Sequence, residues 1–178
     1  YNKTWAEYLH GFEIGEWHWW LGLENILAFN QMGHRTIVLC IVLDSGNFAW
    51  EFRHENFTVN EASSGFSFTS DFKSNISYGP YPMSTLYTPE DIIRMSQGVP
   101  FSSPDIDRDN DINSCAALHG AGWWFNNCAA GQDLNPLGFL PSVMNEPTEY
   151  NRLLIPGVKT DDREFVNNFE SFLLIFVD

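Results

Sequence analysis

Apolar residues recur at helical spacing in two segments near the N-terminus. Residues 1–12 predict a short amphipathic helix, because Thr4 and Glu7 have the spacing of a capping box and Gly11 can end the helix. Its buried face would consist of Trp5, Tyr8, Leu9 and Phe12. Residues 23–31 return to helical spacing and predict a second helix.

Strand patterns follow these helical segments. Residues 34–43 are β-branched and almost continuously apolar, as expected of a strand that is buried on both faces. Residues 48–59 alternate apolar and polar side chains, and the turn-forming residues 44–47 predict an antiparallel hairpin. Residues 172–177 predict a final strand that pairs back into the same sheet. Shorter strand patterns occupy residues 16–21 and residues 63–72.

These elements indicate a single α+β domain with a twisted antiparallel sheet and short helices, since a chain of 178 residues can bury one sizeable core. Residues 73–103 are polar and rich in proline, glycine and serine, which predicts a long loop. Residues 129–157 are irregular. We therefore expect a central sheet subdomain in residues 1–72, a loop-rich subdomain in residues 73–160 and a returning strand in residues 161–178.

Charge and targeting signals narrow the class of protein. The net charge of −14 argues against non-specific binding to nucleic acids or anionic membranes, and is compatible with cations, basic partners or neutral ligands. No apolar run reaches the roughly 18 residues that a membrane span needs. No signal peptide is visible at Tyr1, so we expect a removed N-terminus or a fragment. Sequons at Asn2, Asn56 and Asn75 favour a secreted glycoprotein.

The most distinctive chemistry lies in residues 101–128, here called the acidic loop. Aspartates occupy alternate positions in it, at Asp105, Asp107, Asp109 and Asp111. Carboxylates this close repel one another unless a cation lies between them, and hard oxygen donors on a loop favour calcium over transition metals. We therefore favour a calcium site over a solvated acidic loop. The site is not an EF-hand, because neither possible frame has glycine at position six or glutamate at position twelve.

Cysteines and histidines supply no catalytic pattern. Cys115 and Cys128 enclose twelve residues, and a bridge between them would stabilise the fold by about 3 kcal/mol. Cys40 lies in the most apolar strand and is expected to be a buried thiol. The histidines lack metal-ligand spacing, and no G-x-S-x-G elbow or P-loop occurs, so we expect no enzyme. A metal-dependent hydrolase is the remaining catalytic alternative.

Two aromatic residues of the acidic loop allow two interpretations. Trp123 and Trp124, next to Gly120 and Gly122, could form a stacking platform for a sugar or a local core for the loop. We favour the core for at least one of them. His119 is more typical of a locally satisfied loop histidine than of a ligand contact.

The sequence FSSPDIDRDNDINSCAALHGAGWWFNNC of the acidic loop resembles the core signature of fibrinogen C-terminal globular domains. That family is found in fibrinogen chains, ficolins, tenascins and angiopoietins. Two further segments agree: TWAEYLHGF resembles the tryptophan-bearing helix of the family, and EWHWWLGLENI resembles its FWLGLENI segment. The resemblance covers residues 1–134 well and the remainder poorly, and the family's N-terminal subdomain is missing.

The resemblance implies a calcium site in the acidic loop. Asp107 and Asp109 would supply side-chain ligands, while Asp111 and Asn113 would offer backbone carbonyls. Asp105 would support the loop through hydrogen bonds rather than bind the metal. The loop-rich subdomain would thus be the part of the domain that binds calcium and ligand.

The resemblance also implies a disulfide between Cys115 and Cys128, and a ligand pocket beside the calcium. In family members that bind ligands, this pocket recognises acetyl groups, glycans or a peptide terminus, and a cis peptide bond before the second cysteine shapes it. The corresponding residues here are His119, Asn127, Cys128 and Ala129. Ala129 stands where the family commonly has His or Tyr.

We therefore expect a secreted, non-enzymatic, calcium-dependent recognition module, lectin-like in binding acetylated or other glycans. The alternative is a protein–protein module for a receptor, for adhesion or for oligomerisation, in which no sugar is bound. Oligomerisation could also use segments outside this chain. An aromatic residue or histidine beside Cys128 would favour sugar, and Ala129 weakens that interpretation.

Overall fold

A computed structural model describes residues 2–14, 18–43, 49–78, 92–127 and 168–177 of the chain. Its elements are α1 (Trp5–His10), β1 (Phe12–Ile14), β2 (His18–Trp20), α2 (Leu23–Gln31), β3 (Arg35–Leu43), β4 (Ala49–Val59), η1 (Ala62–Ser64), β5 (Phe68–Tyr78), α3 (Ile92–Ser96), α4 (Cys115–His119) and β6 (Asn168–Val177). Short helices beside antiparallel strands confirm the α+β class. None of the described helices has the length and apolar character needed to cross a membrane.

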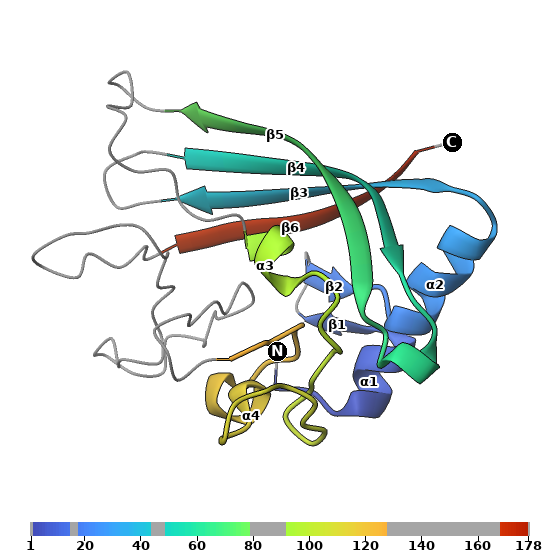
Figure 1. The fold of residues 1–178 in the computed structure, drawn as a ribbon, viewed down its shortest axis with the longest axis vertical. Helices are drawn as coiled ribbons and strands as arrows, with labels where there is room; N and C mark the ends of the chain where they lie inside the picture. Colours follow the sequence, from blue (N-terminus) through green and yellow to red (C-terminus); the bar gives the residue numbers. More distant parts are fainter. Residues whose placement is uncertain (1, 15–17, 44–48, 79–91, 128–167, 178) are drawn as a thin grey trace, which may run out of the picture.

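The main sheet has four strands in the order β5–β4–β3–β6, and all neighbouring strands are antiparallel. β3 and β4 form the predicted hairpin. β6 pairs with β3 from Arg35↔Val177 to Leu43↔Asn168, which confirms the predicted returning strand and lengthens it. Figure 1 shows the helices, the small β1–β2 sheet and the acidic loop on one side of the main sheet.

Helix α1 has the predicted capping box. The Thr4 hydroxyl accepts a hydrogen bond from the Glu7 backbone, and the Glu7 carboxylate accepts one from the Thr4 backbone. The helix ends at His10 because Gly11 has φ +100°, a conformation that favours glycine. Phe12 therefore belongs to β1 rather than to the helix, and β1 pairs with β2. The apolar pattern thus continues across the end of a helix into a strand.

A β-bulge in β4 changes which side chains face the core. Before the bulge the buried side chains are at even positions, Phe52 and His54, and beyond it they are at odd positions, Phe57 and Val59. The register with β5 shifts around Asn56, whose φ of +52° is unusual for a residue other than glycine. The single alternation predicted for this strand is therefore wrong beyond the bulge.

The predicted long loop, residues 73–103, contains regular structure and is a wrong prediction in part. β5 starts at Phe68 and continues past Lys73 to Tyr78, so the sheet extends into this segment. Helix α3, Ile92–Ser96, lies in the same segment. β5 is an edge strand among the described strands, and the polar composition that suggested a loop is compatible with an edge. η1 precedes β5, so this strand also begins later than predicted.

One aromatic core connects the main sheet to the acidic loop. The Trp124 ring meets the Phe68 and Phe101 rings edge-to-face, at centroid distances of 4.8 and 4.9 Å. Trp20 and Phe57 also contact this ring. Other fully buried side chains come from α1, α2, β3 and α3. The loop is therefore part of the domain core and not an appendage.

Candidate functional site

The acidic loop is closed at its base by a short antiparallel bridge. Ser102 and Trp123 exchange backbone hydrogen bonds of 2.9 and 3.0 Å. Just inside the loop, Ser103 and Ile106 exchange two more, also of 2.9 and 3.0 Å. The aspartates that follow therefore start from a fixed base.

Both tryptophans of the loop belong to the core. Trp123 and Trp124 are each 1% exposed. Their indole N–H groups donate to the Ser96 hydroxyl at 2.9 Å and to the Phe66 carbonyl at 2.7 Å, respectively, as buried indoles require. The expectation that at least one of them is core is confirmed. The sugar-platform alternative is wrong, because neither ring is exposed to a ligand.

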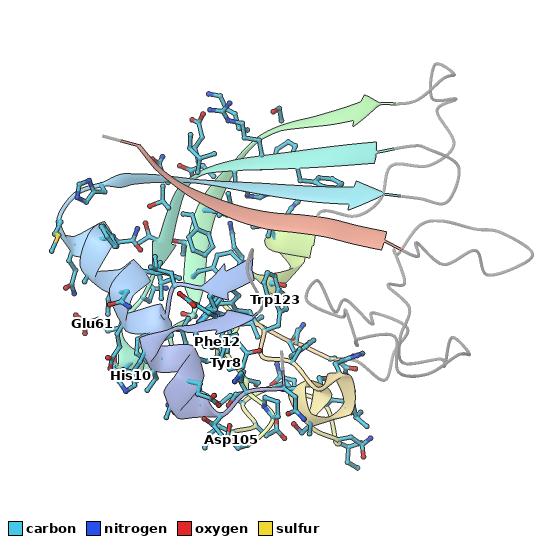
Figure 2. All side chains as sticks on the ribbon, turned by 180° about the vertical axis from the view of Figure 1, so that it is seen from behind. Tyr8, His10, Phe12, Glu61, Asp105 and Trp123 are labelled. Atoms are coloured by element: carbon cyan, nitrogen blue, oxygen red, sulfur yellow. The ribbon has the colours of Figure 1, made fainter. Side chains whose placement is uncertain are left out.

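Helix α1 is fastened to the loop at two points. Asp105 Oδ1 accepts 2.7 Å hydrogen bonds from the Trp5 backbone N–H and from the Ser103 hydroxyl, which confirms its supporting role. The Tyr8 hydroxyl accepts a 2.7 Å hydrogen bond from the Gly122 backbone N–H. Figure 2 shows Tyr8 nearer to the main sheet than Asp105. The two contacts therefore attach α1 to the loop at two different distances from the sheet.

Arg108 is a third link to α1, and the sequence patterns do not predict it. Its guanidinium carbon lies 4.0 Å from the centre of the Trp5 ring, which is a cation–π contact. Its Nη1 donates to the Phe101 carbonyl at 3.3 Å. Burial lowers the pKa of Arg108. One arginine in a run of aspartates is a visible signal, but it suggests an ion pair rather than a contact with an aromatic ring.

Three aspartates shape the loop by accepting hydrogen bonds from the backbone two residues further on. Asp107 accepts from Asp109 at 3.2 Å, Asp109 accepts from Asp111 at 2.8 Å, and Asp111 accepts from Asn113 at 2.9 Å. Asp109 also accepts from the Cys115 backbone at 2.9 Å with its second oxygen. These Asx turns hold the carboxylates in place on a loop without strand or helix pairing.

The carboxyl groups of Asp107 and Asp109 lie close enough to interact with each other. Asp107 is exposed and Asp109 is half-buried. Burial raises the pKa of the Asp109 carboxyl, hydrogen bonds from the Asp111 and Cys115 backbones oppose the rise, and the adjacent Asp107 carboxylate adds to it. A cation between two such carboxylates would relieve their repulsion. Oxygen donors of this kind suit calcium.

The two carboxylates alone would not complete a calcium site. Among the described residues, no group of three or more His, Cys, Asp or Glu side chains could hold a metal. A calcium ion would therefore need backbone carbonyls as well, in the role expected for Asp111 and Asn113. Asp111 is half-buried and Asn113 is exposed. Calcium binding stays a prediction.

The expected ligand pocket lies partly outside the described residues. His119 is 3% exposed, and its ring stacks on Phe125 at a centroid distance of 5.4 Å and an interplanar angle of 17°. It is therefore a buried residue and not a surface one. Asn127 is half-buried. Cys128, Ala129 and the peptide bond between Asn127 and Cys128 lie outside the described residues.

The remaining predicted positions are cysteines and sequons. Cys115 is buried and disulfide-bonded, but its pairing with Cys128 stays a prediction. Cys40 is in register with Phe52, a core residue of β4. Of the sequon asparagines, Asn2 and Asn56 are exposed, and Asn75 lies within β5.

Comparison with known sequences identifies relatives over most of the chain. A family model for the C-terminal globular domain of fibrinogen beta and gamma chains matches residues 1–140. The human fibrinogen alpha chain is 30% identical over 141 residues, covering 73% of this chain and 15% of that protein. Human tenascin-R is 29% identical over 181 residues, covering 92% of this chain and 12% of tenascin-R. Protein scabrous of Drosophila melanogaster is 28% identical over 134 residues, covering 72% of this chain and 14% of scabrous. The chain thus spans a small part of each relative.

Solved structures agree on the fold. The fibrinogen-like globe domain of human ANGPTL6 matches with a TM-score of 0.54 and 22% identity, covering 70% of this chain and 50% of that one. Lamprey fibrin D-dimer, complexed with the peptide ligand Gly-His-Arg-Pro-amide, matches with a TM-score of 0.58 and 22% identity. The match covers 98% of this chain and 55% of the lamprey chain. This chain therefore spans about half of these structures. With its fold and acidic loop, it belongs to the family of fibrinogen C-terminal globular domains.

Proposed function

We propose that this chain is an extracellular, non-enzymatic recognition module in which calcium orders the acidic loop and a protein or peptide is the ligand. The observation that carries the calcium part is the pairing of Asp107 with Asp109 in a partly buried loop. Family membership supports the recognition part, because relatives such as tenascin-R and angiopoietin-related protein are extracellular proteins.

Calcium would supply positive charge between two carboxylates that repel each other. Asp107 and Asp109 would hold it through their side chains, and Asp111 and Asn113 through backbone carbonyls. The Asx turns already hold these side chains in place through backbone hydrogen bonds, which limits the conformational entropy lost on binding. An ordered loop would then present its own C-terminal end, which includes Asn127.

A protein or peptide ligand is favoured over a glycan by the burial of the aromatic residues. The side chains that could stack on a sugar, Trp123 and Trp124, are 1% exposed, and His119 is 3% exposed. The net charge of −14 favours a basic ligand. A peptide containing His and Arg is the ligand named for the lamprey fibrin structure. Acetylated glycans are the competing class, and the ligand test below separates the two.

Calorimetry of the metal-free chain with CaCl₂ tests the calcium assignment. We expect one bound ion in the wild type and at least a tenfold loss of affinity, about 1.4 kcal/mol, in Asp107→Asn. Asp105→Asn is the matched control in the same loop, because it makes the same charge change at a residue that bonds to α1. Glu61→Gln, an exposed carboxylate outside the loop, is a second control. Equal affinity in Asp107→Asn and in both controls would end the assignment.

The ligand class is tested on the immobilised chain in calcium and in chelator. One arm uses an array of N-acetylated and other glycans, and the other uses a library of basic peptides and extracellular protein ectodomains. Calcium-dependent binding in the second arm supports the proposal. Binding confined to acetylated sugars would replace it with the lectin interpretation.

A further inference from the structure

The β-bulge of β4 places the sequon Asn56-Phe57-Thr58 with its asparagine in solvent. In an unbroken strand Asn56 would share a face with Phe52 and His54, which are 1% and 0% exposed. Beyond the bulge Phe57 is buried instead, while Asn56 and Thr58 are exposed. The bulge therefore separates the sequon from the core while keeping its aromatic residue inside.

The surroundings of Asn56 form a hydrated face of the sheet. Its Nδ2 donates a 2.7 Å hydrogen bond to Asp71 Oδ2 on the neighbouring strand β5. The same face carries Glu55, which pairs with Arg53 at 3.2 Å and with Lys73 at 3.6 Å. Charged residues of this kind remain in contact with water. A polar oligosaccharide attached here would not displace packed side chains.

The sequon at Asn75 has the opposite placement. Asn75 is the register partner of Phe52, which is 1% exposed. Directly opposed residues of antiparallel strands lie on the same face of the sheet. Asn75 therefore shares a face of the sheet with Phe52, the face that packs on the core at that position.

We propose that Asn56 carries an N-linked oligosaccharide and that Asn75 does not, an inference that rests on the extracellular location proposed above. The donor is a lipid-pyrophosphate-linked oligosaccharide. The bond between the sugar C1 and the pyrophosphate oxygen breaks as a C1–Nδ2 bond forms, and one Nδ2 proton is released. The second Nδ2 proton remains for the hydrogen bond to Asp71.

Expression of this chain behind a secretion leader in animal cells tests the assignment. Glycopeptide mass spectrometry reads occupancy at each sequon separately, both in the medium and in the cell lysate. Thr58→Ala removes the acceptor sequon at an exposed position, and Thr58→Ser is the matched control that keeps it. We expect the Asn56 peptide to be glycosylated in the wild type and in Thr58→Ser, and unmodified in Thr58→Ala. The Asn75 peptide of secreted chains should be unmodified.

An unmodified Asn56 in chains that have entered the secretory pathway would overturn the inference, and so would a glycan on Asn75 in secreted chains. Failure of the extracellular proposal would be seen in a different measurement. Because the supplied leader directs the chain into the secretory pathway whatever its natural location, occupancy of Asn56 is read independently, and the extracellular proposal is tested separately by the location of the protein in its native cells.

Discussion

The Tyr8 hydroxyl accepts a 2.7 Å hydrogen bond from the backbone N–H of Gly122, which lies 114 positions further along the chain. Both residues are buried. This bond joins the first helix of the chain to the end of the acidic loop, so the position of the loop depends on α1.

Tyr8→Phe should lower the free energy of unfolding by about 1–3 kcal/mol, because the buried Gly122 N–H loses its acceptor. Urea unfolding followed by tryptophan fluorescence measures the change. The Trp20 indole donates to the Tyr8 backbone carbonyl, which phenylalanine retains, so the loss reports the hydroxyl. An unchanged unfolding midpoint would contradict the assigned role of this bond.

Gly122→Ala should destabilise the domain by about 1–3 kcal/mol through overpacking. A Cβ at this position would lie 2.7 Å from two Tyr8 ring carbons and 2.8 Å from a Phe101 ring carbon. Gly33→Ala is the control, since its Cβ would meet nothing within 4 Å and it bears only the cost of φ +88°, about 1 kcal/mol. The unfolding temperature of Gly122→Ala should therefore be lower than that of Gly33→Ala. The reverse order would show that the contact is easily relieved.

Calcium should raise the unfolding temperature of the metal-free chain, because an ion that binds the folded state stabilises it. At a free calcium concentration 100 times the Kd, the gain is about 2.7 kcal/mol. Asp109→Asn should abolish this gain, and magnesium should give a smaller one, since it demands a tighter octahedral shell. Differential scanning calorimetry with and without chelator makes the measurement. An equal shift in Asp109→Asn would place the ion elsewhere.

Acid should weaken the domain in part through Glu7. The Thr4 backbone N–H and the Lys3 ammonium lower the pKa of Glu7 from 4.5 to about 2. Its contribution to stability is therefore complete above pH 4.5 and is lost as the pH falls through about 2. The urea midpoints of the wild type and Glu7→Gln should differ at neutral pH and converge as the pH approaches about 2.

Lys3→Met provides the control for this pH dependence. It removes the 2.9 Å ion pair and leaves the Thr4 contacts, so the pKa of Glu7 is lowered less and the loss of stability should be complete at a higher pH than in the wild type. Parallel acid profiles for all three proteins would show that the capping box does not set the pKa of Glu7.

Elements that depend on neighbours in the sequence were predictable. The Thr4–Glu7 capping box, helix α2 and the β3–β4 hairpin all rest on patterns within a few residues, and each is present. β6 was also predictable, because its apolar run needs a place in a sheet. The spacing of Asp107 and Asp109 indicated paired carboxylates, which the loop does bring together.

Features that depend on partners far away were not predictable. Nothing local to Arg108 indicates that it will lie on the Trp5 ring. Similarly, two adjacent tryptophans have the same pattern whether they pack inward or present a platform. The cited partners of Trp124, Phe68 in β5 and Phe66 just before it, are more than 50 positions away in the sequence. The bulge at Asn56 reverses the burial pattern of β4, because it adds one residue that the alternation does not show.

The contacts between α1 and the acidic loop also set an order of events during synthesis. Trp5 and Asp105 are 100 positions apart, and Tyr8 and Gly122 are 114 apart. At the usual pace of translation, α1 leaves the ribosome on the order of ten seconds before its partners exist. During that interval Trp5 and Tyr8 lack the loop residues that fix them in the folded domain, so α1 reaches its final position only after the acidic loop has been synthesised.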